Sequence, residues 1–242
     1  MPLVTIIGRG HGGTRAMSHT LSASGVFMGE QINESGDMLP PDALYEACRV
    51  IGRRIRHLGG FRWDFDSLHT GPIDPAFTRL LERYLAPVFR NPALDKGWKL
   101  PETTLVYPWL VRLFPDIHYI HWIRDPRDSI HGGHLTDDLA AFGIPWKGDG
   151  SLLARRVASW KYQREIVRAT PAPARQIAVR FEDFVLKQDE TLAKLRDFLG
   201  RPLAKLPVRP GSVGRWRAAA AEERDATAVL APDVLELGYP LS

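Results

Sequence analysis

Four glycines stand within six residues near the start of the chain, in the sequence VTIIGRGHGGTRAM at residues 4–17. An apolar run leads into these glycines and a helical pattern follows them. This order is typical of a strand, an anion-binding loop and a helix N-terminus. Glycine lets the backbone come close to a phosphate or sulfate group. The residues that we expect to bind the anion are Arg9, Gly10, His11, Gly12, Gly13, Thr14 and Arg15.

The spacing of these glycines matches two patterns. Gly8, Gly10 and Gly13 fit G-x-G-x-x-G, which is typical of dinucleotide binding. Gly8 and Gly13 also have the G-x-x-x-x-G spacing of a nucleoside-triphosphate loop, but Thr14 stands where that motif needs lysine. Ordinary hydrolysis of ATP or GTP is therefore disfavoured, while dinucleotides and other phosphate or sulfate esters stay open as ligands.

Two more basic segments fall where predicted elements end. Arg124 follows an aromatic and β-branched stretch at residues 117–123, which reads as a strand. The sequence RPGSVGRWR at residues 209–217 supplies Arg209 and Gly211. Ligands of open α/β sheets bind beyond the carboxyl ends of the strands. A ligand with anionic groups at two separate positions would therefore use the first loop and one of these segments together.

Composition narrows the class of ligand. The chain has 242 residues and a net charge of +4, from 32 Lys and Arg against 28 Asp and Glu. No dense block of Lys and Arg is present, so a small anion fits better than nucleic acid. Cys48 is the single cysteine, and no run approaches the length of a membrane span. We expect a cytoplasmic protein without a membrane span, in an oligomeric state that the sequence leaves open.

Strand and helix patterns alternate along the whole chain, which predicts a mainly parallel central sheet flanked by helices. The expectation is a single α/β domain over residues 1–242. Its Gly- and Pro-containing stretch at 136–150 is a candidate lid. Other predicted elements are strands at 3–8 and 26–28, and helices at 13–24 and 42–58.

Five segments in order resemble the sulfotransferases that use 3′-phosphoadenosine 5′-phosphosulfate (PAPS). GGTRA at 12–16 resembles the 5′-phosphosulfate loop of the heparan-type members, and YIHWIRDPRD at 119–128 resembles the 3′-phosphate motif. FEDF at 181–184 through FLG at 198–200, and RPGSVGRWR at 209–217, are similar to two later family stretches. WKLP at 98–101 is also family-like.

The resemblance implies a P-loop-NTPase-like fold and transfer of a sulfuryl group from PAPS to a hydroxyl acceptor, without a metal. It places Lys99 near the sulfuryl group, Glu30 as the general base, and His11 at the phosphate–sulfate bridge. Arg124 would hold the 3′-phosphate, with help from Arg209 and Gly211. The acceptor would be a small molecule or a carbohydrate.

The chain departs from the family pattern at three positions. His11 stands in place of the lysine of the first loop, so His11 or Arg9 has to supply that charge. Gly132 replaces a serine that follows the motif arginine, and Ser129, His131 or His134 would substitute for it. Pro210 replaces a lysine of the late loop, and with it a backbone N–H.

Two other functions are consistent with the same residues. The G-x-G-x-x-G match, with Glu30 at roughly the ribose-binding distance, fits an NAD(P)-dependent oxidoreductase of the Rossmann type. The replacements at His11 and Gly132 fit a nucleotide-binding protein without catalytic activity. Aromatic candidates for the acceptor cleft, or else for the core, are Trp63, Phe65, Trp98, Trp109 and Trp146.

Overall fold

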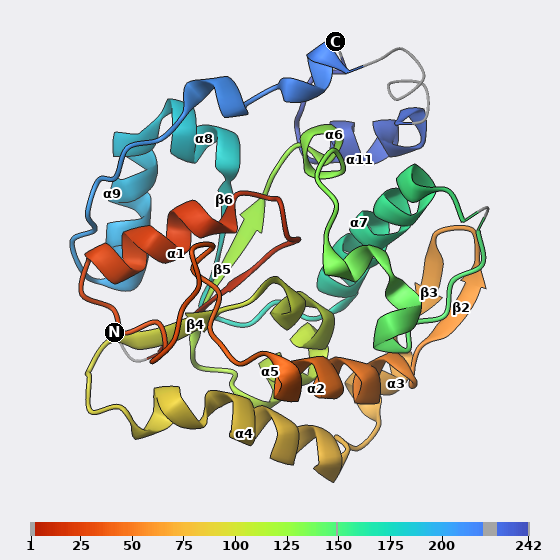
Figure 1. The fold of residues 1–242 in the computed structure, drawn as a ribbon, viewed down its shortest axis with the longest axis horizontal. Coiled ribbons are helices and arrows are strands. Elements are labelled where there is room, and N and C mark those ends of the chain that lie inside the picture. Colours follow the sequence, from red (N-terminus) through yellow and green to blue (C-terminus); the bar gives the residue numbers. More distant parts are fainter. Residues whose placement is uncertain (1–2, 149, 220–226, 242) are drawn as a thin grey trace.

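A central sheet of four parallel strands organises the fold. The computed structural model describes residues 3–148, 150–219 and 227–241. The strands lie in the order β4-β1-β5-β6 (Figure 1). Their bounds are β1 Leu3–Ile7, β4 Lys96–Lys99, β5 His118–Ile123 and β6 Gln176–Arg180. All three pairings within the sheet are parallel, as the alternation of strand and helix patterns predicted.

Strand β1 is buried on both faces because both of its sets of alternating side chains are apolar. Leu3 and Ile7 join the hydrophobic cluster on one face of the sheet, while Val4 and Ile6 join the cluster on the other. This is the pattern of a strand between two helical layers. The loop that follows β1 therefore lies at the carboxyl end of a central strand of the sheet.

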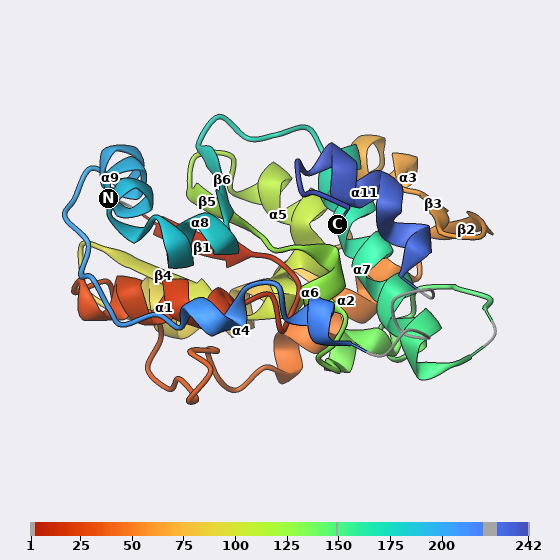
Figure 2. The same ribbon diagram turned by 90° about the horizontal axis from the view of Figure 1, so that it is seen from above.

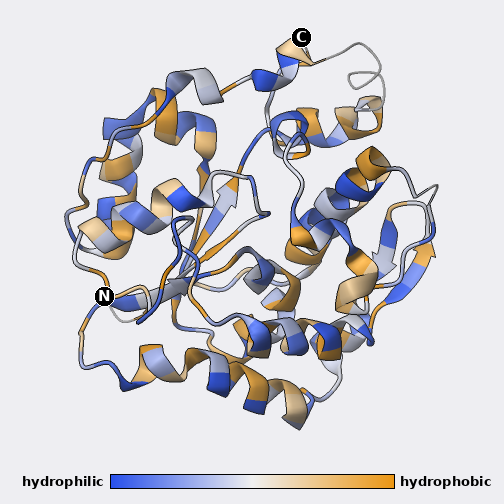
Figure 3. Ribbon diagram, in the orientation of Figure 1, coloured by the Kyte–Doolittle hydropathy of each residue, from blue (hydrophilic) through white to orange (hydrophobic). Residues whose placement is uncertain are grey.

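Helices cover both faces of the sheet (Figures 1 and 2). One layer holds α1 (Thr14–Ala23), α8 (Phe181–Leu186) and α9 (Gln188–Leu199). The other layer holds α2 (Asp42–Gly52), α4 (Pro75–Arg90), α5 (Tyr107–Leu113) and α7 (Leu152–Ala169). Apolar and polar residues alternate around α2 and α4, as expected of helices with one buried face (Figure 3).

Short elements complete the chain. They are the antiparallel hairpin of β2 (Arg56–Gly59) and β3 (Arg62–Asp64), the helices α3 (Asp66–Thr70), α6 (Pro126–Ser129) and α11 (Ala231–Glu236), and the 3₁₀ turns η1 (Pro101–Val106), η2 (Leu135–Asp137), η3 (Leu139–Phe142), η4 (Pro210–Ser212), η5 (Arg215–Ala218) and η6 (Ala228–Leu230). Within the described ranges, no helix is long and apolar enough to cross a membrane.

Two predicted elements differ in the structure. Residues 26–28 form no strand, and only Phe27 makes an isolated bridge, to Lys96. The helix predicted over 42–58 stops at Gly52, and the hairpin starts at Arg56. At Gly52, the last residue of the helix, a Cβ atom would lie 2.2 Å from the carbonyl oxygen of Phe142, so this end of the helix packs closely against another segment. A contact of that kind leaves no local sequence pattern.

Part of the candidate lid belongs to the core. Leu139, Phe142 and Ile144 are buried in the same cluster as α2 and α4. Their packing ties the first half of the stretch 136–150 to the helical layer. A lid stays a prediction for the residues after Ile144.

Candidate functional site

The first loop is shaped by positive backbone φ angles and close contacts. Gly13 has a φ of 86° and ends the loop at the start of α1. A Cβ atom on Gly13 would lie 2.6 Å from the Phe181 ring, so space and backbone both require glycine there. Helix α1 begins without a side-chain cap and without an acidic residue in its first turn. Its N-terminal N–H groups and dipole therefore favour an anion at this loop.

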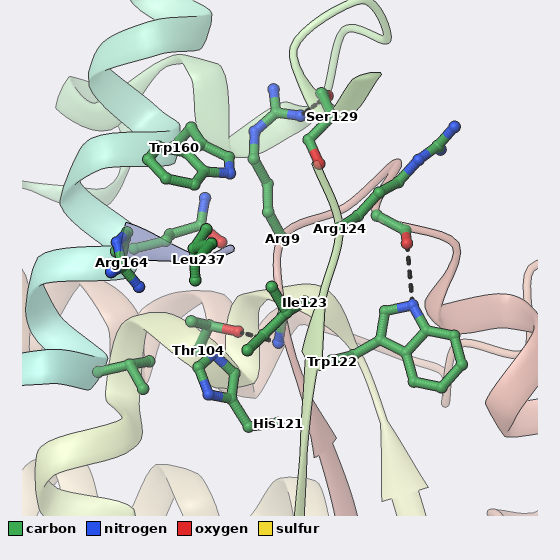
Figure 4. A pocket seen from close by; sticks show the side chains of 14 residues that line it. Arg9, Thr104, His121, Trp122, Ile123, Arg124, Ser129, Trp160, Arg164 and Leu237 are labelled. Atoms are coloured by element: carbon green, nitrogen blue, oxygen red, sulfur yellow. Dashed lines mark hydrogen bonds between the residues drawn. The ribbon is translucent and has the colours of Figure 1, made fainter. Parts of the chain in front are cut away.

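Contacts from behind hold this loop in place (Figure 4). The N–H of Gly8 donates to Thr104 Oγ1 at 2.9 Å, and Trp122 Nε1 donates to the carbonyl oxygen of Gly12 at 2.9 Å. Arg124 Nη1 donates to the carbonyl oxygen of His11, also at 2.9 Å. The loop is therefore preorganised by neighbouring strands before any ligand binds.

A cleft of about 600 Å³ opens in front of the loop. Its size is typical of a small-molecule site. The cationic side chains among its described lining residues are Arg15, Lys99, Arg124, Arg209 and Arg215, and the carboxylate among them is Asp37. This excess of positive charge suits a ligand that carries several negative charges.

Arg124 is brought into the cleft by the end of β5, as the sequence predicted. Its guanidinium lies 4.5 Å from the centre of the Phe181 ring and donates to the carbonyl oxygen of Ser212 at 2.6 Å. Its buried Nε has no hydrogen-bond partner among the described residues. An anionic ligand would supply the missing acceptor, because buried polar groups are normally hydrogen-bonded.

The late loop is fastened to the same corner by Asp128. This buried carboxylate accepts the N–H groups of Gly214 and Trp216, each at 2.8 Å, and lies 3.4 Å from Arg124. The fastening brings Arg209 to the cleft, as predicted. Gly211 is exposed and is not among the described residues that line the cleft, so its contact with the 3′-phosphate stays a prediction.

Lys99 stands at the end of β4 and faces the cleft. Its Nζ donates to Asp37 Oδ1 at 2.5 Å and to the carbonyl oxygen of Ser35 at 3.0 Å. Burial lowers the pKa of Lys99, although the adjacent Asp37 carboxylate opposes this effect. A desolvated ammonium group beside the anion loop can stabilise negative charge that develops there.

The carboxyl groups near Lys99 differ from the predicted one. Glu30 is exposed and is not among the described residues that line the cleft. The chain returns to the cleft at Asp37, after a turn at Gly36 with a φ of 71°. Glu102 is buried three residues after Lys99, and burial raises its pKa to about 7. Asp37, and not Glu30, is therefore the carboxylate that lines the cleft beside Lys99.

Two predicted contacts turn away from the cleft. Arg9 lies behind the loop, in a small second cavity, where it forms a buried ion pair with Asp137 and donates to the carbonyl oxygen of Ser129 (Figure 4). Ser129 lines that second cavity as well. The acceptor that Arg9 needs comes from Asp137, far away in sequence, so the first loop alone could not indicate this pairing. Arg9 and Ser129 support the loop from behind.

The sequence missed two groups of the cleft. Asp37 lines it, and Phe181 closes one wall. Arg215 also lines the cleft, and its place in the basic late loop beside Arg209 had indicated it, whereas Asp37 carried no signal beyond its polar surroundings. The aromatic candidates Trp63, Phe65, Trp98 and Trp109 are buried in the core, and Trp146 packs against it, so no described lining residue comes from this set.

Metal binding was not expected from the sequence. In the described part of the chain, no group of three or more His, Cys, Asp or Glu side chains is placed to hold a metal ion.

A model of the Sulfotransferase family matches residues 2–205, which is most of the chain. The chain belongs to this family. No curated protein matches its sequence.

Solved sulfotransferase structures share the fold. A sulfotransferase from Alicyclobacillus acidocaldarius superposes with a TM-score of 0.55 at 15% identity, over 98% of this chain and 94% of that one. The sulfotransferase domain of the Synechococcus PCC 7002 olefin synthase has a TM-score of 0.50 at 14% identity, over 100% and 96%. Sulfotransferase STF9 from Mycobacterium avium has a TM-score of 0.50 at 14% identity, over 99% and 77%. At these identities the likeness establishes the α/β fold with its parallel sheet.

Proposed function

We propose that this chain transfers a sulfuryl group from PAPS to the hydroxyl group of a small-molecule or carbohydrate acceptor. The observation that carries the proposal is the single cleft lined by the anion loop, Lys99, Arg124 and the late loop. Family membership favours the same reaction. The unpartnered Nε of Arg124 and the five cationic lining residues fit a donor with anionic groups at both ends.

Different residues of the cleft bind the two anionic ends of PAPS. The backbone of residues 10–14 and the N-terminus of α1 bind the 5′-phosphosulfate, because they offer N–H donors to an anion. Arg124 and Arg209 bind the 3′-phosphate, and Arg215 lies close enough to the cleft to assist. PAPS, when bound, supplies a sulfuryl group on a phosphate leaving group.

Lys99 stabilises the negative charge that develops in the reaction, and Asp37 acts as the general base. Lys99 Nζ stabilises the bridging oxygen as the bond from sulfur to that oxygen breaks. Asp37 takes the proton of the acceptor hydroxyl as its oxygen bonds to sulfur. The ion pair of 2.5 Å between them places both groups at one point of the cleft. Asp37 replaces Glu30 in this role because Glu30 is exposed away from the cleft lining.

The first test is binding and transfer with purified protein. Adenosine 3′,5′-bisphosphate should bind in calorimetry, and radiolabelled sulfate should pass from PAPS to a member of an acceptor panel. Tighter binding of NAD(P) than of the bisphosphate would support the oxidoreductase instead. Bisphosphate binding without transfer to any acceptor would support the non-catalytic binding protein.

Substitutions separate the proposed roles. Lys99→Ala should lower kcat about 100-fold or more, as loss of one preorganised charge donor does. Arg124→Ala should weaken bisphosphate binding about 30-fold, since it removes a desolvated charged contact. The matched controls Lys205→Ala and Arg196→Ala change exposed residues of paired surface charges and should have little effect. Normal transfer by both Lys99→Ala and Arg124→Ala would refute the assignment.

A separate pair of variants tests which carboxylate is the general base. Asp37→Asn should lower kcat about 100-fold, which is typical for loss of general base catalysis. Glu30→Gln provides the opposing test, since it removes the carboxylate that the sequence suggested. A large loss with Glu30→Gln and none with Asp37→Asn would return the role to Glu30.

A further inference from the structure

Each of two loops beside the cleft contains one histidine and one glycine, and the histidine ring of each loop packs against the glycine of the other. Gly10 and His11 belong to the anion loop, and Gly132 and His134 belong to the segment after α6. A Cβ atom on Gly132 would lie 2.4 Å from Nδ1 of His11, and the three atoms nearest to it all belong to that residue. A Cβ atom on Gly10 would lie 2.0 Å from Cδ2 of His134, again with His134 supplying the three nearest atoms. Each ring therefore occupies space that a glycine of the other loop leaves open.

The backbone does not explain these two glycines. Neither Gly10 nor Gly132 is among the glycines with positive φ, so other residues could adopt their conformations. His11 is the residue with the demanding backbone, since it has a φ of 61° without being glycine. Its carbonyl oxygen is fixed by Arg124 at 2.9 Å. The ring of His11 is thus held in one place by its own backbone and by Gly132.

The two imidazoles have different neighbours. Their ring centres lie 6.1 Å apart in an edge-on arrangement, and both rings line the cleft. Nδ1 of His134 faces the hydroxyl of Thr136 at 3.0 Å, and Nε2 lies 3.8 Å from Glu102 Oε1. Nδ1 of His134 is therefore engaged by Thr136, while Nε2 lies beyond hydrogen-bond distance of Glu102. The ring of His11 hydrogen-bonds to the backbone of Gly133 and lines the cleft as part of the anion loop.

The surroundings of His11 favour its neutral form before a ligand binds. Partial burial, reinforced by the positive charge of Arg9, lowers the pKa of His11. The charged and titratable groups that face it are Arg9, Arg124, His134, Asp137 and Arg156. Arg9 and Asp137 already neutralise each other in a buried ion pair. An anion in the cleft would add a negative charge next to the ring and so favour its protonation.

We propose that His11, seated on Gly132, is a proton-linked anion ligand: it takes up a proton when the 5′-phosphate end of the donor binds to the loop. This inference rests on the proposed function, because the anion loop has to bind a nucleotide of this class. The positive charge of the anion loop then comes from His11, which becomes protonated when the ligand binds. It also makes Gly132 a requirement of His11, through the space that the ring occupies.

The first experiment measures protons taken up on binding. Calorimetry with adenosine 3′,5′-bisphosphate at pH 7 in buffers of different ionisation enthalpy gives the number of protons bound per ligand. The wild type should take up more protons than His11→Asn, whose amide tolerates positive φ and does not titrate. His57→Gln, in the hairpin outside the cleft, is the matched control and should behave like the wild type. His11→Gln serves the same purpose if His11→Asn does not fold.

The outcomes separate this inference from the proposed function. Equal proton uptake by wild type and His11→Asn, with binding retained, would overturn the role of His11 alone. No binding of the bisphosphate to the wild type would overturn the proposed function, and this inference with it.

The second experiment tests the link between the loops. Gly132→Ala should weaken bisphosphate binding about tenfold in the wild type and less than about threefold in a His11→Gly background, which keeps the positive φ and removes the side-chain atoms that the new Cβ would meet. Thermal unfolding of each variant checks that the fold is kept. An equal loss in both backgrounds would show that Gly132 does not serve His11.

Discussion

The Glu102 carboxyl group shows how strongly burial controls charge at this site. Its side chain is 1% exposed, and its Oε2 has no hydrogen-bond partner among the described residues. Burial, with a smaller contribution from Asp37, raises its pKa from 4.5 to about 7, although Lys99 opposes the shift. The charged form of Glu102 is therefore unfavourable in the folded protein and favourable in the unfolded chain.

This difference predicts a pH dependence of stability at the residue scale. As pH rises from 4.5 to about 7, the unfolded chain loses the Glu102 proton before the folded protein does, so the free energy of unfolding falls. Glu102→Gln removes this loss. Relative to wild type, the variant should gain at most about 3 kcal/mol between pH 5 and pH 8 in denaturant unfolding. Glu82→Gln, on the exposed side of α4, is the control, and a difference that does not change with pH would contradict the prediction.

At the scale of elements, the cleft depends on how the end of β5 is tied to the late loop. Helix α6 begins at Pro126 with Asp125 as its cap, which turns Asp128 toward the late loop. Trp216 packs against the guanidinium of Arg127, 3.6 Å from the ring centre. The stacking surface that Trp216 offers is therefore used by the protein itself. Two basic segments that are distant in sequence become one binding wall.

Removing this fastening should affect binding and stability together. Asp128→Ala leaves the N–H groups of Gly214 and Trp216 without their acceptor and Arg124 without its carboxylate. Stability should fall by about 2–4 kcal/mol, and bisphosphate affinity should fall about tenfold or more. Denaturant unfolding and calorimetry measure both effects. Asp189→Ala, an exposed carboxylate of α9, is the control. An unchanged affinity in a folded Asp128→Ala protein would show that the late loop is not needed.

At the scale of the whole molecule, the last described residues pack against Arg127, three residues after Arg124. Residues 240 and 241 lie beside α6, where Arg127 donates to the carbonyl oxygens of Pro240 at 2.6 Å and Leu241 at 3.0 Å. The hydroxyl of Tyr239 donates to Glu182 Oε2 at 2.7 Å. Glu182 in turn accepts the N–H of Asp125 at 3.0 Å. One chain of contacts therefore joins the C-terminal segment to the start of α6.

Breaking that chain of contacts should cost stability more than binding. Tyr239→Phe keeps the ring that packs against Arg180 and removes only the hydroxyl. The buried Glu182 then loses a donor, so unfolding should become easier by about 1–3 kcal/mol. Bisphosphate affinity should change less than about threefold, because the cleft lining is untouched. Unaltered stability would mean that solvent replaces the hydroxyl at no cost.

Local patterns made much of the fold predictable. The run of apolar residues before Gly8 predicted β1, and the alternation of strands with helices predicted a parallel sheet between two layers. Asp74 before Pro75 is a pattern typical of a helix start, and at the start of α4 the side chain of Asp74 accepts the N–H of Ala76 at 2.9 Å. The predicted end of α2 was wrong, since the helix stops at Gly52 and the hairpin starts at Arg56. Local periodicity carries no information about the close packing of Gly52 against Phe142.

By itself, the sequence indicated segments that line the cleft: the glycine loop, Lys99, Arg124 and the late loop. Glycine spacing and the ends of predicted elements pointed to three of them, and the family resemblance pointed to Lys99. The tertiary structure decided which side chains of those runs face the cleft. Arg9 pairs with Asp137, Asp37 rather than Glu30 lines the cleft, and Gly132 leaves space for the ring of His11. Each outcome depends on a partner from a distant segment, because direction and space are set by packing between elements. His11 was identified from the sequence of the glycine loop. The glycine that leaves space for its ring, Gly132, lies in a separate segment after β5.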